Sequence, residues 1–164
     1  MPIAQSLLPE FDHEMEVTRK LLSRVPESKA AWKPHTKSYS LGELVVHVSN
    51  LLTWTDIAVN GDDFDFATQF KRPAPFSSTK ALLDFFDANV RNARAAIASA
   101  SDEQLKKPWT LRNGQQTIFT MPKAAVLRSF VMNHHIHHRG QLSVYLRMQD
   151  VPLPNMYGPT ADER

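Results

Sequence analysis

The chain contains no cysteine among its 164 residues. This absence excludes a disulfide framework, a thiolate metal ligand and a cysteine nucleophile. Any sulfur chemistry carried out by the protein must therefore use a thiol supplied by another molecule. A chain without disulfides also suits a reducing compartment, so we expect a cytoplasmic protein.

Long apolar runs and charge of a single sign are also missing. No stretch reaches the roughly 18 uncharged apolar residues that a membrane-spanning helix needs, and the N-terminus lacks the basic and apolar regions of a secretory signal. The 19 basic and 17 acidic residues are interspersed and give a net charge of +2. We therefore expect a small-molecule ligand and neither a nucleic acid nor a membrane as partner.

Glycine is scarce, with five residues, and apolar residues recur at helical spacing along most of the chain. Such periodicity predicts amphipathic helices that each bury one face. We predict an all-α fold, a four-helix bundle forming one domain over residues 1–164, with an extended, proline-containing C-terminal tail after Arg147. The four expected helices cover residues 6–25, 40–59, 78–100 and 122–147.

The connections between these helices carry three local signals. Ser40 and Glu43 have the spacing of a capping box, which predicts that a helix starts at Ser40. Residues 61–77 combine acidic, aromatic and proline residues without the ligand pattern of a calcium loop, so we interpret them as a solvated connection. Residues 109–120 place a turn signal between apolar and β-branched residues, which predicts a small hairpin.

Four of the seven histidines lie in the five residues from His134 to His138. On a helix, residues four apart stack on one face, and only His134 and His138 have that spacing here. A helical projection places both on a broad face that is apolar at its two ends, so we expect that face to point into the core. The face comprises Leu127, Phe130, Val131, His134, His138, Gln141, Leu142 and Tyr145.

Two buried imidazoles need partners for their ring nitrogens, since a buried polar group left unpaired costs about 1–3 kcal/mol. Both cannot be protonated cheaply in a dry core, and neutral histidine is a common ligand of divalent metals. The helix expected over residues 40–59 offers His47 within its own apolar stripe. A metal site between facing helices, a pair of hydrogen-bonded core histidines and a His-rich surface turn are all compatible with this pattern.

The combination of these motifs resembles the DinB family of DinB/YfiT-like metalloenzymes. One histidine in the second helix precedes a later His-x-x-x-His motif, which Arg-Gly-Gln and then Tyr-Leu-Arg follow. The resemblance extends over essentially the whole chain. Its further matches are Pro9-Glu10-Phe11, Trp32-Lys33-Pro34-His35, the segment from His138 to Arg147 and the tail from Tyr157 to Glu163.

The resemblance implies a four-helix bundle whose metal ligands are His47, His134 and His138. Zinc or nickel is the usual metal of the family, and many members resemble dimers, so a homodimer is expected. Relatives include transferases that use low-molecular-weight thiols, a thiol-dependent isomerase and hydrolases. The resemblance therefore implies a metal-dependent thiol transferase or hydrolase acting on a small electrophile. The alternative is a damage- or stress-related metal- or ligand-binding bundle without turnover.

Three side chains near the expected ligands are candidates for catalysis. Gln141, one turn beyond His138, could line a pocket or act only as a buried amide bonded to a neighbouring helix. Tyr145 could donate a proton or simply pack in the core. Glu43 could accept a proton beside His47 or serve only as the helix cap. His135 and His137 are expected to support the site or to lie at the surface, and Arg139 is expected to be exposed.

Overall fold

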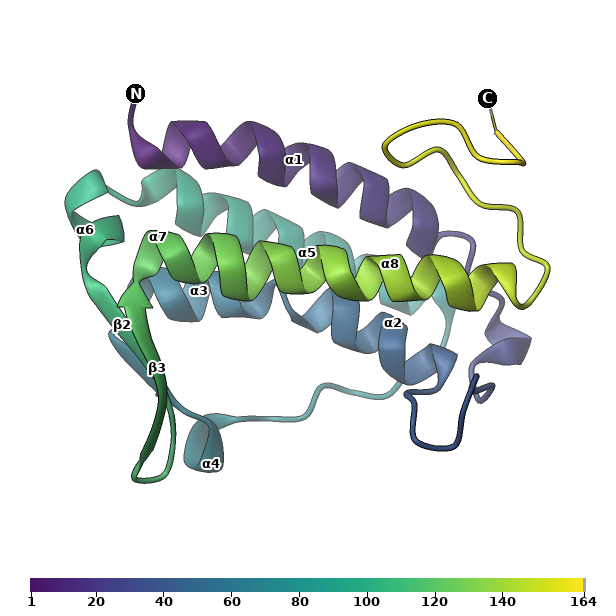
Figure 1. The fold of residues 1–164 in the computed structure, drawn as a ribbon, viewed down its shortest axis with the longest axis horizontal. Coiled ribbons are helices and arrows are strands. Elements are labelled where there is room, and N and C mark those ends of the chain that lie inside the picture. Colours follow the sequence, from purple (N-terminus) through teal and green to yellow (C-terminus); the bar gives the residue numbers. More distant parts are fainter. Residues whose placement is uncertain (164) are drawn as a thin grey trace.

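The structure is a computed structural model and describes residues 1–163. Helices form most of it, and a small three-stranded sheet lies at one end of the long helices (Figure 1). The helices are α1 (Ile3–Leu22), η1 (Glu27–Lys29), α2 (Leu41–Asn50), α3 (Thr53–Asn60), α4 (Phe66–Gln69), α5 (Thr79–Ser99), α6 (Asp102–Lys106), α7 (Lys123–Ala125), the π-helical η2 (Val126–Met132) and α8 (Asn133–Arg147). The strands are β1 (Asp63–Asp65), β2 (Pro108–Asn113) and β3 (Gln116–Pro122).

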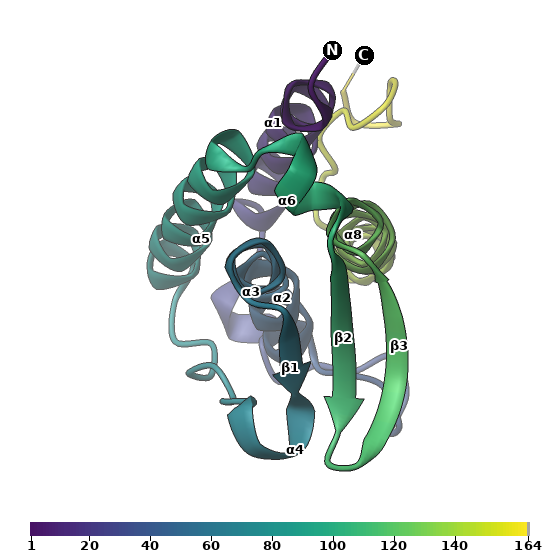
Figure 2. The ribbon, with the colours of Figure 1, turned by 90° about the vertical axis from the view of Figure 1, so that its left-hand side faces the viewer.

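The long helices α1, α5 and α8 run alongside the pair formed by α2 and α3 (Figures 1 and 2). Their facing sides contribute a continuous apolar core, which includes the fully buried Phe11, Phe86 and Trp109. Among residues 1–163, no helix has both the length and the apolar character needed to cross a membrane. Helices lie at all four positions expected from the sequence, but their boundaries and internal breaks differ from the prediction.

The prediction of an all-α fold was imprecise, because residues 63–122 also form a sheet of order β1-β2-β3. Strand β1 pairs in parallel with β2, and β2 pairs with β3 as the expected antiparallel hairpin. The loop from residue 61 to 77 is thus partly structured, and Asp65 is only 5% exposed. Its carboxylate accepts hydrogen bonds from the Gly114 backbone at 2.9 Å and from Arg112 at 2.8 Å. Long-range bonds of this kind leave no local periodicity in the sequence.

The helix expected over residues 40–59 is divided into α2 and α3. The capping box at its start is confirmed: Ser40 Oγ accepts from the Glu43 backbone at 3.1 Å, and the Glu43 carboxylate accepts from the Ser40 backbone at 2.7 Å. At the break, the Ser49 carbonyl accepts a hydrogen bond of 3.0 Å from the Asn89 side chain of α5. A partner from another helix thus satisfies a carbonyl near the end of α2, where a continuous helix would have bonded it internally.

The helix expected over residues 122–147 is also interrupted, because its part from Val126 to Met132 is a π-helix. Beyond α8, residues 151–163 contain no helix or strand and fold back beside α1 (Figure 1). Asp162 accepts from the Leu153 backbone at 2.9 Å and pairs with Arg147. Glu163 pairs with Arg24 of the segment after α1, which fastens the tail to the N-terminal helix region.

Lys123 joins the sheet end of the molecule to α3. Its side chain is buried, and Nζ donates to the carbonyls of Val59 at 3.0 Å and Gly61 at 2.6 Å. Nζ also lies 3.2 Å from a carboxylate oxygen of Asp62. The ammonium group therefore satisfies carbonyls at the end of α3, the role that a C-terminal cap performs.

Replacement of this buried lysine should destabilise the protein. Lys123→Met keeps most of the side-chain volume but leaves the Val59 and Gly61 carbonyls without their donor, so we expect a loss of about 1–3 kcal/mol in the free energy of unfolding. Urea denaturation followed by circular dichroism measures this loss. The exposed Lys106 of α6 provides the control, and Lys106→Met should change stability by less than about 0.5 kcal/mol. Equal stabilities for the two variants would contradict the capping role.

Candidate metal centre

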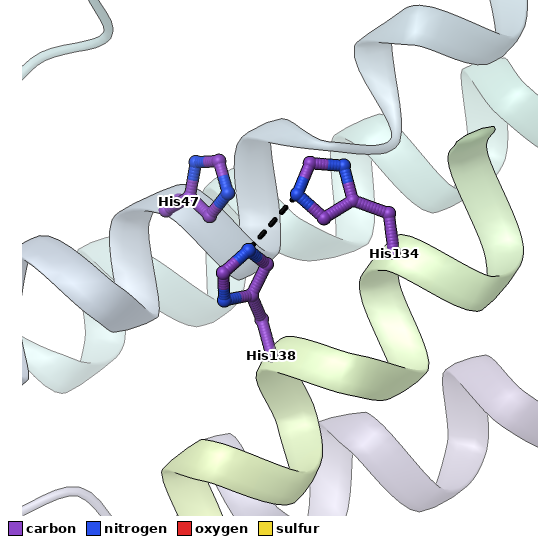
Figure 3. Close-up of side chains that lie close together, drawn as sticks. All are labelled: His47, His134 and His138. Carbon is purple, nitrogen blue, oxygen red and sulfur yellow. Dashed lines mark hydrogen bonds between the residues drawn. The ribbon is translucent and has the colours of Figure 1, made fainter.

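The structure brings His47 of α2 together with His134 and His138 of α8 (Figure 3). One ring nitrogen from each of the three lies within 4.8 Å of the others. The Nε2 atoms of His134 and His138 are 2.9 Å apart, and the His47 ring centre lies 4.5 Å from that of His138. Among the described residues, this group contains no carboxylate. It is therefore a set of three imidazoles from two facing helices.

Helical spacing places the three rings at one level of the molecule. His134 and His138 are four residues apart on α8, so their side chains point in the same direction. His47 lies in the last turn of α2, opposite them. The π-helix η2 ends just before α8 begins. Its wider turn changes the angle around the helix axis at which the His134 side chain projects toward His47.

The histidine face of α8 lies at the rim of the core and not within it, contrary to the sequence-based expectation. His134 and His138 are half-buried and Gln141 is exposed. The apolar members Leu127, Val131 and Leu142 of the expected face are buried, as predicted. The other buried positions of α8 are His135, Arg139 and Leu146, and the first two lie one residue, or roughly 100°, around the helix from His134 and His138.

The expectation that His135 and Arg139 are supporting or surface residues missed a buried polar network. The Arg139 guanidinium is 2.6 Å from the Glu14 carboxylate of α1, and both residues are at least 95% buried. Tyr157 of the tail donates to the same carboxylate at 2.7 Å. His135 Nε2 lies 2.8 Å from the Thr18 hydroxyl of α1. Polar partners on distant segments therefore allow polar residues to occupy the core face, while His137 is exposed as expected.

The three imidazoles of the candidate site are electrically neutral at pH 7. Burial, together with the neighbouring His138 and His134, lowers the pKa of His47 to about 4. Burial also lowers the pKa of His134 and of His138, although the Phe130 carbonyl and the Gln141 amide oppose these shifts. Neutral imidazole is the form that binds a metal, because the ligand nitrogen must carry a lone pair.

The three catalytic candidates from the sequence all have partners in the structure. The Gln141 amide oxygen lies 2.7 Å from Nδ1 of His138, so it contacts a candidate ligand directly. The Tyr145 hydroxyl donates to the Tyr39 carbonyl at 3.2 Å. The Glu43 carboxylate is engaged by the Ser40 backbone and lies 3.4 Å from Lys33 Nζ. None of the three presents an unengaged acid or base to the histidines.

Sequence reasoning did not identify Tyr39, which lies in the loop before α2. Its ring centre is 5.5 Å from that of His47, and the residue is 48% exposed. Its backbone carbonyl accepts a hydrogen bond of 3.2 Å from the Tyr145 hydroxyl. Because Tyr39 precedes the capping box and belongs to no periodic stretch, no sequence pattern marks it.

These residues fit a divalent metal. Three convergent nitrogens at the rim of the core match the three protein ligands of catalytic zinc sites, which leave a further position for water or substrate. The Nε2 atoms of His134 and His138 are only 2.9 Å apart. Two nitrogen lone pairs that face each other at this distance repel, so a proton or a cation must lie between them. The half-buried position of the rings leaves one side of the group toward solvent.

Comparison with known sequences identifies one family. The DinB family model matches residues 1–164. YrdA of Bacillus subtilis, described as uncharacterized, is 26% identical over 160 residues, which cover 95% of this chain and 89% of the relative. YjoA of the same organism is 24% identical and covers 92% of this chain and 94% of the relative.

Solved structures show that the fold is DinB-like. A DinB-like protein from Bacillus cereus superposes with a TM-score of 0.72 at 21% identity, covering 93% of this chain and 97% of that one. The structure of YjoA gives a TM-score of 0.69 at 20% identity, covering 97% and 99%. A family member from Exiguobacterium sibiricum gives 0.64 at 18% identity, covering 97% and 96%. At these identities the likeness concerns the fold alone.

The geometry predicts which histidines control metal content. His47→Ala, His134→Ala and His138→Ala should each strongly reduce the zinc retained after dialysis, because a three-ligand site loses one donor. Elemental analysis of protein purified without a histidine tag measures this. His137→Ala removes an exposed imidazole of the same helix and should keep full metal content. Full stoichiometry in His134→Ala would show that the three-histidine group does not hold the ion.

The metal-free protein should lose stability as the pH falls below about 6.5. Burial, with the neighbouring Arg139 charge, lowers the pKa of His135 to about 3, whereas an unfolded histidine titrates near 6.5. Between these values the unfolded chain binds a proton that the folded protein does not, so this group removes about 1.4 kcal/mol per pH unit. Urea unfolding from pH 7.5 to pH 4.5 measures the slope. His135→Leu should lower this slope by about 1.4 kcal/mol per pH unit, which corresponds to the uptake of one proton fewer on unfolding. An unchanged slope would exclude His135 as the group responsible.

Proposed function

Because the chain belongs to the DinB family, we propose that it is a metal-dependent enzyme in which His47, His134 and His138 hold one divalent ion. The proposed activity is a transferase reaction that uses a low-molecular-weight thiol, or a hydrolysis, on a small electrophilic substrate. The observation that carries this proposal is the convergence of three neutral imidazole nitrogens at the rim of the core.

The donor set favours activation of a nucleophile. Three neutral ligands leave the full double charge of a divalent ion in place, since the group includes no carboxylate among the described residues. When bound, such an ion lowers the pKa of a coordinated water or thiol toward neutrality. The chain itself has no cysteine, so the sulfur of a transferase reaction must come from a cosubstrate.

The residues of the chain then hold and orient the reactants. His47, His134 and His138 fix the position of the ion between α2 and α8. Tyr39 places a partly exposed aromatic ring beside His47. The Tyr145 hydroxyl donates a hydrogen bond to the backbone carbonyl of Tyr39 and so positions the loop before α2 at the site.

A non-catalytic metal- or ligand-binding module, related to damage or stress, is the second candidate. The observation that favours it is the engagement of the Gln141, Tyr145 and Glu43 side chains with other groups. Without an unengaged acid or base beside the ligands, general acid–base catalysis would depend on Tyr39 or on the substrate. The two candidates therefore differ in whether nucleophile binding leads to turnover.

Further properties belong to this proposal. We propose zinc or nickel as the ion, since imidazole ligands suit both. A homodimer, a cytoplasmic location and a small-molecule substrate follow from the sequence expectations. The arrangement of α1, α2–α3, α5 and α8 supports a four-helix bundle with a divided second helix, in one domain over residues 1–164.

Cobalt substitution tests the proposed function. If the ion binds a thiol as thiolate, adding a cellular thiol to the cobalt-loaded protein should produce a sulfur-to-cobalt charge-transfer band in the near ultraviolet. We expect this band at neutral pH, where a free thiol with a pKa of about 8.5 is mostly protonated. The band should be absent from His47→Ala, which lacks one of the three donors.

Turnover assays separate the remaining possibilities. Transfer of the thiol to model electrophiles identifies a transferase, and hydrolysis of esters or amides without any thiol effect identifies a hydrolase. A protein that binds cobalt but gives neither product across a broad panel would support the non-catalytic module. Failure of the purified protein to bind any divalent ion would overturn the metal-dependent function.

A further inference from the structure

Gln141 contacts His138 on the side of the ring that faces away from the histidine cluster. Its amide oxygen lies 2.7 Å from Nδ1 of His138, whereas Nε2 of His138 faces His134. An amide oxygen only accepts hydrogen bonds, so Nδ1 must carry the proton in this contact. A neutral imidazole has one proton, so Nε2 is left with a lone pair directed into the cluster.

We propose that Gln141 is a positioning residue that selects the His138 tautomer able to bind a divalent ion through Nε2. The inference rests on the proposed metal site. Without the amide oxygen, the proton of His138 can move to Nε2, where it blocks the lone pair and can be shared with His134. Groups that bond the second nitrogen of a ligating histidine fix both its tautomer and its orientation.

The amide also preserves the charge of the site. A carboxylate at position 141 would accept the same Nδ1–H bond but would add a negative charge next to the ligands. Glutamine supplies the acceptor without that charge, which leaves the group of three neutral imidazoles unchanged. Because the Gln141 side chain is exposed, water competes for its place, so the effect of its removal should be moderate.

Zinc affinity tests this role. Competition with a chromophoric chelator should show about 10-fold weaker zinc binding by Gln141→Ala, the lower end of the range for such supporting groups. Gln141→Glu restores an acceptor and should bind zinc at least as tightly as the wild type. Gln149→Ala is the matched control, because the Gln149 amide donates to the carbonyl of the adjacent Met148 and not to a candidate ligand. An affinity of Gln141→Ala within twofold of the wild type would overturn the proposal.

A second measurement reports the tautomer itself. Long-range nitrogen–proton NMR of the metal-free protein should show His138 protonated at Nδ1 in the wild type and in Gln149→Ala. In Gln141→Ala, the Nε2-protonated form should become substantially populated, which a purely structural role of Gln141 would not produce. An unchanged tautomer in Gln141→Ala would overturn the inference. Wild-type protein that binds neither zinc nor any other divalent ion would overturn the proposed function, and the tautomer measurement would then decide the role of Gln141 alone.

Discussion

The arrangement of the long helices depends on the buried ion pair between Arg139 of α8 and Glu14 of α1. The charged groups are 2.6 Å apart, and Arg139 also donates to the Glu14 carbonyl at 3.1 Å. Removing one partner of a buried pair typically costs 3–5 kcal/mol, since the other charge is left uncompensated. The pair therefore favours the observed rotation of α8 against α1, and the Tyr157 hydroxyl of the tail donates to the same Glu14 carboxylate.

This rotation determines the character of the histidine site. With Arg139 and His135 directed toward α1, the side chains of His134 and His138 lie roughly 100° away and meet His47 of α2. They are buried enough to remain neutral but keep one side toward solvent. A site at the rim can admit a ligand without a conformational opening, which a site at the centre of the core could not. The same interaction thus provides rigidity on one face of α8 and access on the next.

The sequence predicted the three histidines correctly as a group, because residues four apart on a helix must share a face. It placed His134, His138 and Gln141 too deep and missed the burial of His135 and Arg139, whose partners on α1 no local pattern reveals. The parallel pairing of β1 with β2 and the division of α2 from α3 were missed for the same reason. Each depends on a bond to a distant segment, such as that from Asn89 to Ser49. The periodicity of a sequence shows which residues are apolar. The burial of Arg139, the β1–β2 pairing and the break between α2 and α3 depend instead on hydrogen bonds and ion pairs between distant polar groups.

The network around Glu14 also constrains the order of events during biosynthesis. Glu14 and Thr18 leave the ribosome early, yet their partners Arg139, His135 and Tyr157 lie 117 to 143 residues further along the chain. Until translation reaches them, the nascent α1 exposes an apolar face and a carboxylate that has no counter-charge. Because contacts between such distant residues form slowly, the unpaired helix is a natural target for chaperones that hold the emerging chain. The histidine site, which depends on the same docking of α8, can be completed only at the end of synthesis.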